Sequence, residues 1–101
     1  MTQATVRRKS SGPARLALPA RLEISSLGAL NKKMRTHYNA RRTELVLDGG
    51  EVTVIDSAGV QLLVGFVTAM NARGCKLSWE NYSVQVYQMA SELGLADSLG
   101  D

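Results

Sequence analysis

The side chains that could act as nucleophiles or bases in this 101-residue chain are few and far apart. The chain has one histidine, His37, and one cysteine, Cys75, and both lie far in sequence from Ser57, which follows an aspartate at the start of an apolar segment. Nucleophilic catalysis requires a nucleophile and a base within hydrogen-bond reach of each other, and no part of the sequence shows that pattern. We therefore expect no enzymatic activity and no catalytic residue.

Metal and cofactor sites also lack their usual signatures. A single Cys and a single His do not supply the ligand spacing of a zinc site. No Walker-type or dinucleotide-binding glycine loop occurs, and the pair Gly49-Gly50 is too short to cradle a phosphate and is typical of a turn. We expect neither a metal nor a cofactor.

The net charge of +3 is concentrated at one end of the chain. Arg7, Arg8 and Lys9 account for it, which leaves nine basic and nine acidic residues from Ser10 onward. A neutral folded part argues against nucleic acid as a partner. No apolar run reaches the length of a membrane span, and Met1 to Ser10 lacks the apolar core of a signal peptide. With a single cysteine as well, a cytoplasmic protein without membrane insertion is expected.

The chain divides into a short lead-in and one domain. Residues 1–14 contain almost no large apolar side chain and include Ser-Ser-Gly-Pro, which predicts a disordered segment. Residues 15–101 are enough for one small domain with a single core.

The segment around which the domain is organised runs from Leu45 to Met70. The apolar run 45–47 predicts a buried strand, Asp48-Gly49-Gly50 a turn, and the β-branched residues 52–55 an extended segment. A helix is then expected to start at Asp56-Ser57, where both residues are good N-cap types, and to end at Arg73-Gly74.

The remaining elements follow the same alternation. Strands are expected over 15–18 and 22–24, with Pro19 marking an edge or a bend, and over 76–79. We predict a first helix that is capped by Ser25 or Ser26 and extends to about Arg42, and a last helix that runs from Ser83 to Gly94. The apolar stripe of the first helix consists of Leu27, Leu30, Met34 and Tyr38. Alternating strands and helices predict an α/β fold with a mostly parallel sheet.

The helix after Ser57 is apolar over a wide arc, with a narrow strip of small or polar residues at Gln61, Gly65, Thr68 and Ala72. Full burial of such a helix is difficult in a small domain, so we expect its first turn, Ala58 to Gln61, to be exposed. The same argument predicts that three further side chains are partly exposed, Val60, Leu62 and Val64. Self-association through these side chains is therefore left open.

The segment VIDSAGVQLL, Val54 to Leu63, resembles the signature of the STAS domain, the family of bacterial anti-sigma factor antagonists and their relatives. In that family an apolar strand is followed by Asp-Ser or Asp-Thr, a small residue, Gly and an aliphatic residue that together open a helix. The resemblance extends over about Leu16 to Leu99. It implies the STAS fold, a small mixed, mostly parallel sheet covered by helices mainly on one face.

The resemblance also implies a function. In anti-sigma factor antagonists the hydroxyl residue directly after the motif aspartate is phosphorylated by the partner kinase, which here implies phosphorylation of Ser57. The implied partners are an anti-sigma factor that is also a serine kinase of the GHKL type, and a serine phosphatase. The partner-binding surface implied by the motif, together with the two serines that precede the first helix, comprises Ser25, Ser26, Asp56, Ser57, Ala58, Gly59, Val60 and Gln61.

Three alternatives accompany this expectation. Ser57 could serve only as a helix cap. STAS proteins also act as subunits of ABC-type lipid-asymmetry transporters, in which the same helix end docks on the ATPase without phosphorylation; those members usually have Thr at the position of Ser57. Members linked to chemotaxis or biofilm control keep the switch and change its output.

Overall fold

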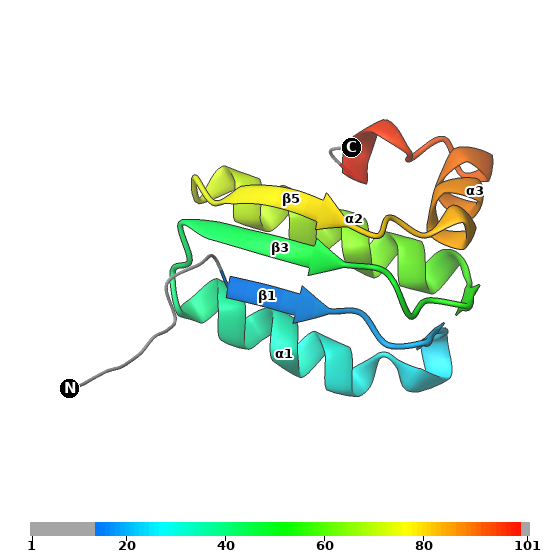
Figure 1. The fold of residues 1–101 in the computed structure, drawn as a ribbon, viewed down its shortest axis with the longest axis horizontal. Coiled ribbons are helices and arrows are strands. Elements are labelled where there is room, and N and C mark those ends of the chain that lie inside the picture. The colour runs from blue at the N-terminus through cyan, green and yellow to red at the C-terminus, as the bar shows by residue number, and fades with distance from the viewer. Residues whose placement is uncertain (1–13, 100–101) are drawn as a thin grey trace.

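The computed structural model describes residues 14–99, so the predicted lead-in lies outside the described residues except for Ala14. Strands and helices alternate in the order β1 (Ala14–Ala17), β2 (Arg21–Leu22), α1 (Gly28–Asn39), β3 (Glu44–Asp48), β4 (Val54–Ile55), α2 (Ser57–Ala72), β5 (Lys76–Glu80) and α3 (Val84–Glu92). Short 3₁₀ turns occupy Ile24–Ser26 (η2) and Asp97–Leu99 (η3). Figure 1 shows this arrangement, which confirms the predicted α/β class.

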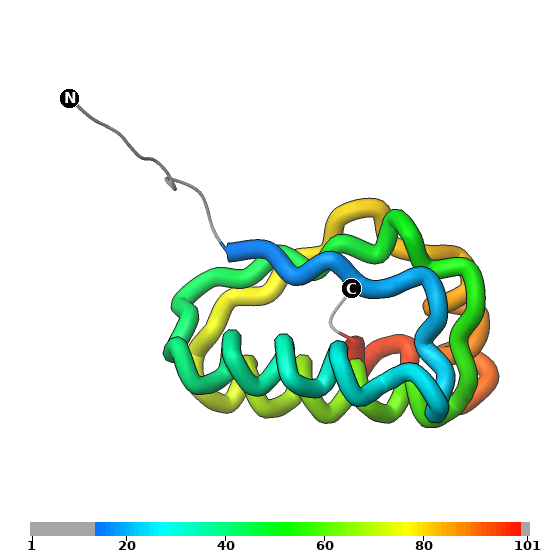
Figure 2. Tube along the Cα trace, turned by 90° about the horizontal axis from the view of Figure 1, so that it is seen from below, coloured from blue at the N-terminus to red at the C-terminus, as the bar shows by residue number. Residues whose placement is uncertain are grey.

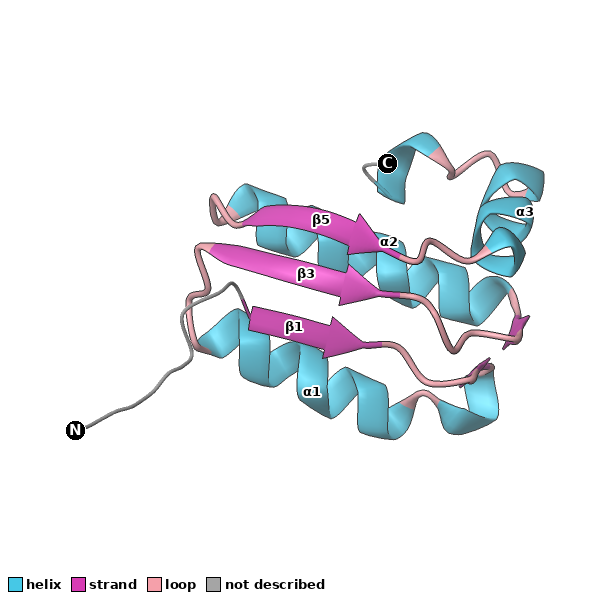
Figure 3. Ribbon diagram, in the orientation of Figure 1, coloured by secondary structure: helices cyan, strands magenta, loops and turns pink. Residues whose placement is uncertain are grey.

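The strands form two parallel sheets. β1, β3 and β5 lie side by side in that order, with Leu16 opposite Leu47 and Leu47 opposite Trp79. The short strands β2 and β4 form a separate pair beyond the ends of the larger sheet, where Leu22 lies opposite Ile55 (Figure 3). Helix α2 starts directly after β4, so its N-terminus lies at the edge toward which the strands point.

Helices α1 and α2 lie next to each other on one face of the three-stranded sheet, as Figure 2 shows. The core between these layers is built from leucines of the strands and from the inward faces of both helices, including Leu45, Leu47, Leu63 and Met70, which are all at most 1% exposed. Trp79 packs against this core and donates a hydrogen bond from its indole Nε1 to the carbonyl oxygen of Leu99, at 3.0 Å.

The other face of the sheet is mostly polar among the residues described, although Val46 in the middle of β3 is buried there, at 6% exposure. Arg15 on β1 forms ion pairs with Asp48 on β3, at 3.0 Å, and with Glu80 on β5, at 2.8 Å. Apolar and polar side chains alternate along β5, where Leu77 and Trp79 are half-buried and Lys76, Ser78 and Glu80 are exposed. Parallel sheets are usually covered on both faces, and this one has the one-sided pattern more typical of antiparallel sheets.

Several predicted boundaries are wrong in detail. The strand predicted over 22–24 ends at Leu22, because the chain turns into η2 at Ile24. Neither Ser25 nor Ser26 caps α1: the N-cap position is Leu27, with no side-chain hydrogen bond, and Ser26 instead bonds within η2. Helix α1 ends at Asn39 rather than near Arg42, because Arg41 adopts a left-handed conformation with φ 55°.

Candidate functional site

Asp56 joins two segments that are 32 residues apart in sequence. Its carboxylate oxygen Oδ1 accepts a hydrogen bond from the backbone N–H of Gly59 at 2.9 Å, and Oδ2 accepts one from the backbone N–H of Ile24 at 3.0 Å. The first bond caps α2, and the second holds η2 against the start of that helix. This side chain therefore ties η2 to the first turn of α2, in addition to the pairing of β2 with β4.

Donors to both carboxylate oxygens stabilise the ionised form of Asp56. The backbone N–H of Ile24, and after it that of Gly59, lower the pKa of Asp56 below the usual value for a carboxyl group. Asp56 thus supplies a fixed negative charge at the N-terminus of α2, where the helix dipole also favours an anion.

Ser57 is the first residue of α2 and is exposed. The alternative in which Ser57 only caps the helix is wrong, because Asp56 occupies the N-cap position and its side chain makes the capping bond. Within the part of the chain that the structure describes, no hydrogen bond involves the hydroxyl of Ser57. The fold therefore leaves this hydroxyl accessible to a modifying enzyme or a partner.

The prediction that the first turn of α2 is exposed is wrong for Gly59 and Val60. Both are buried, and Val60 is 0% exposed. A Cβ atom on Gly59 would collide with the carbonyl oxygen of Leu22 in β2. The absence of a side chain at Gly59 thus allows β2 to approach α2 closely. Neither Gly59 nor Val60 exposes a side chain to a partner or to a second copy of the chain.

The accessible part of the site comes from two elements. Ser57 and Gln61 are exposed and Ala58 is half-buried on α2, and Ser25 is exposed on η2. Ser26 is half-buried, and its hydroxyl donates to the carbonyl oxygen of Arg21, at 2.9 Å. The bond from the N–H of Ile24 to Asp56 thus places η2, which contains both serines, next to the Asp56-Ser57 segment.

Ile24 belongs to this surface, although its sequence pattern placed it in a strand. Its side chain is 75% exposed, the largest value among the large apolar side chains of residues 14–99. The polar residues Glu23 and Ser25 on either side, with Pro19 upstream, were the only sequence signals that the strand had already ended. An exposed isoleucine held beside Ser57 adds apolar area to the site.

The remaining reactive side chains lie elsewhere. His37 on α1 accepts a hydrogen bond at Nδ1 from Arg42 Nε, at 3.3 Å, and burial, followed by the charge of Arg42, lowers the pKa of His37. Cys75 is buried, and burial raises the pKa of its thiol. Between residues 14 and 99 no cluster of three or more His, Cys, Asp or Glu side chains could hold a metal. In the same range no helix has the length and apolar character needed to cross a membrane.

A protein-family model matches this chain. The family described as "Mlab, STAS domain" matches residues 5–101, starting eleven residues before Leu16, where the motif resemblance starts. No curated protein matches the chain. The family match covers nearly the whole sequence, including every residue of the Asp56-Ser57 site, and it agrees with the parallel sheet and the one-sided helical layer. This chain therefore belongs to the STAS domain family.

Proposed function

We propose that this protein is a phosphorylation-controlled protein-binding switch of the anti-sigma factor antagonist type. Without a phosphate on Ser57 it binds a serine kinase that also acts as an anti-sigma factor, or a related regulator, and with the phosphate it releases that partner. One observation carries the proposal: Asp56 caps α2, so Ser57 is exposed beside it with a hydroxyl that takes part in no hydrogen bond among residues 14–99.

The fold is expected to tolerate the phosphate. Ser57 is exposed, so the added group enters solvent rather than the core. The helix dipole favours an anion at this position by about 0.3–1 kcal/mol. Asp56 offsets part of that gain, because its ionised carboxylate already accepts the N–H of Gly59 and repels a second negative charge.

A bound partner is expected not to tolerate the phosphate on Ser57. A partner surface over Ile24, Ser57 and Gln61 would have to accommodate close to two new negative charges. Burial of a poorly compensated charge costs several kcal/mol, and about 3 kcal/mol already lowers affinity roughly a hundredfold. The switch therefore acts on the interface and leaves the domain folded.

The test starts with intact mass measurement and site mapping on the protein isolated from its own cells. The expected result is one phosphate on Ser57 in a fraction of the molecules, and a GHKL-type kinase that co-purifies with the unmodified fraction. Isothermal titration of that kinase should then show a loss of affinity of about a hundredfold for Ser57→Asp. Ser78→Asp, an equal change of charge at an exposed position of β5, is the matched control and should bind normally. Tight binding by Ser57→Asp would refute the switch.

The second candidate is a STAS subunit that docks on the ATPase of an ABC-type lipid-asymmetry transporter through the same end of α2. The matched family description favours it, because that description names Mlab rather than an anti-sigma factor antagonist. In that case the protein isolated from cells carries no phosphate on Ser57 and is stoichiometric with an ABC ATPase. A switch with a chemotaxis or biofilm output would instead keep the phosphate and change the identity of the partner. Both candidates are binding functions, and neither assigns catalysis to this chain.

A further inference from the structure

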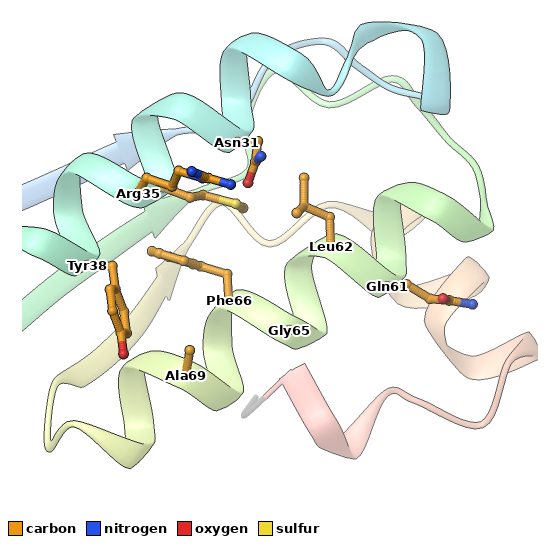
Figure 4. A pocket seen from close by; sticks show the side chains of 9 residues that line it. Asn31, Arg35, Tyr38, Gln61, Leu62, Gly65, Phe66 and Ala69 are labelled. Atoms are coloured by element: carbon orange, nitrogen blue, oxygen red, sulfur yellow. The ribbon is translucent and has the colours of Figure 1, made fainter.

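The helical layer contains an open apolar groove between α1 and α2, with a volume of about 340 Å³. Met34 and Phe66 form its buried floor, at 3% and 7% exposure, and Leu62 is half-buried at its side. Figure 4 shows the side chains of Arg35 and Tyr38 on α1 facing those of α2 across the groove. One end is lined by Gln61, one helical turn from Ser57, so the groove continues from the proposed binding site.

Gly65 lies in the middle of the groove, and the fold of this chain does not require a glycine there. Apart from its two chain neighbours and the backbone of its own helix, a Cβ atom at this position would meet no atom within 4 Å. A glycine inside a helix is nonetheless less favourable than an alanine. The missing side chain deepens the groove and lets the backbone of another molecule approach α2 closely.

The charge around the groove has one sign. Residues 28–43 and 57–74, which contain α1 and α2, include no Asp or Glu and six basic residues: Lys32, Lys33, Arg35, Arg41, Arg42 and Arg73. Every ion pair found among residues 14–99 belongs to Arg15 or Arg21 instead. The net charge of the folded part is near zero although its charges are unevenly distributed. The helical face is basic, and Asp48 and Glu80 lie on the opposite, sheet face.

Three of these arginines gather at the end of the groove remote from Ser57. Arg41, Arg42 and Arg73 line a hollow of about 80 Å³ that shares Tyr38 with the groove. Arg73 is positioned over the ring of Tyr38, 4.3 Å from its centroid, and donates to the carbonyl oxygen of Tyr38 at 3.4 Å. Three guanidinium groups without an acidic partner in the described part of the chain repel one another, so a negatively charged group from outside would be attracted to this end.

We propose that this groove binds an amphipathic α-helix of the partner protein, with apolar side chains along the groove and Asp or Glu side chains at the Arg41, Arg42 and Arg73 end. The groove extends from Gln61 to Ala69, about 12 Å at the rise of an α-helix, which matches anchors at positions i, i+4 and i+7 of a bound helix. It is shallow and near the lower limit of small-molecule pockets, about 300 Å³, so a small ligand would leave much of its surface in water. This proposal extends the proposed binding function, since it specifies the chemistry of the partner.

The probe is a synthetic 16-residue helical peptide with Leu at positions i, i+4 and i+7 and three Glu in its last turn. Two-dimensional amide NMR on the full chain should show shifts at Leu62, Gly65 and Arg73 on titration. A matched peptide with Gln in place of the three Glu should bind at least tenfold more weakly, and so should the Glu peptide when the ionic strength is raised. Gly65→Leu fills the groove and should weaken binding at least tenfold, whereas Gly65→Ala should bind within about threefold of the wild type.

Both Gly65 variants should unfold at or above the wild-type temperature, so a loss of binding cannot be ascribed to misfolding. No shifts at millimolar peptide, shifts outside the groove, or equal affinity of the Glu and Gln peptides would overturn the proposal. Groove shifts with dodecyl phosphate but not with the peptide would also overturn it and assign the groove to a small anionic amphiphile. The groove is tested with the peptide on the unmodified chain and the Ser57 switch with the whole kinase, so failure of the groove and failure of the Ser57 switch are separate results.

Discussion

Substitution of glycine by alanine is expected to change the stability of the domain in opposite directions at two positions of α2. Gly59 and Gly65 are six residues apart in one helix. At Gly65 a Cβ atom meets no atom within 4 Å outside its chain neighbours and its own helix backbone, so Gly65→Ala should gain the difference in helix propensity, about 0.8–1 kcal/mol. For a domain of this size that raises the unfolding temperature by about 4–8 °C.

At Gly59 the added Cβ would collide with the carbonyl oxygen of Leu22 and lie 3.0 Å from the side chain of Ile55. The collision must displace the carbonyl group that accepts the backbone N–H of Asp56, at 3.1 Å. Overpacking costs about 1–3 kcal/mol and a weakened hydrogen bond about 0.5–1.5 kcal/mol. After the gain in propensity, Gly59→Ala should destabilise the domain by about 1–3 kcal/mol.

The assay is urea and thermal unfolding followed by far-UV circular dichroism and by the fluorescence of Trp79. The two variants should differ by about 2–4 kcal/mol, with the wild type between them. If Gly59→Ala were as stable as Gly65→Ala, the close approach of β2 to α2 would be refuted. The absence of a side chain at Gly59 would then leave room for a partner rather than for the carbonyl group of Leu22.

Three further predictions concern other parts of the chain. The folded-state pKa of Asp56 is depressed, so its ionised form stabilises the fold above about pH 4, and this contribution is lost as the pH falls through the folded pKa. In urea titrations the stability difference between wild type and Asp56→Asn should therefore shrink from pH 6 to pH 2. A constant difference would contradict a depressed pKa at Asp56. Ser83 caps α3 by accepting the N–H of Val86 at 3.4 Å, so Ser83→Ala should cost about 1 kcal/mol in the same titrations, whereas Ser91→Ala, at an exposed position, should cost little. Cys75 is 4% exposed and its thiol pKa is raised, so a disulfide reagent at pH 8 should label it slowly in buffer and rapidly in urea. Fast labelling of the native protein would show that the core opens around β5.

Much of the fold could be predicted because local patterns and tertiary packing agree. The strand 45–47, the helix after Asp56, the glycine that ends it and the cap at Ser83 were all predicted from residue types, and the structure contains each of them. The strip of Gln61, Gly65, Thr68 and Ala72 is exposed, as the helical period of α2 indicated. In each case the side chains that favour the element locally are those that the core requires.

The predictions failed where a contact between distant segments decided the outcome. Residue type alone did not distinguish Asp56 from Ser57 as the cap; the N–H of Ile24 fixes one carboxylate oxygen and leaves the other facing Gly59. Burial of Gly59 and Val60 depends on β2, which approaches from 37 residues upstream, as Leu22 shows. Ile24 is exposed because η2 interrupts a strand whose alternating pattern would have continued.

The sequence by itself determined the class of the fold, the family and the position of Ser57 at the start of a helix, because these depend on patterns within short segments. Only the tertiary structure decided that Asp56 caps that helix and that η2 is bonded to Asp56 next to Ser57. It also decided that a groove forms between α1 and α2, with Arg41, Arg42 and Arg73 around a hollow at one end. Total charge and composition carry no information about which residues share a face. That information arises only when β2 and β4 pair and α1 packs beside α2, so the arrangement of residues on this surface is a product of packing.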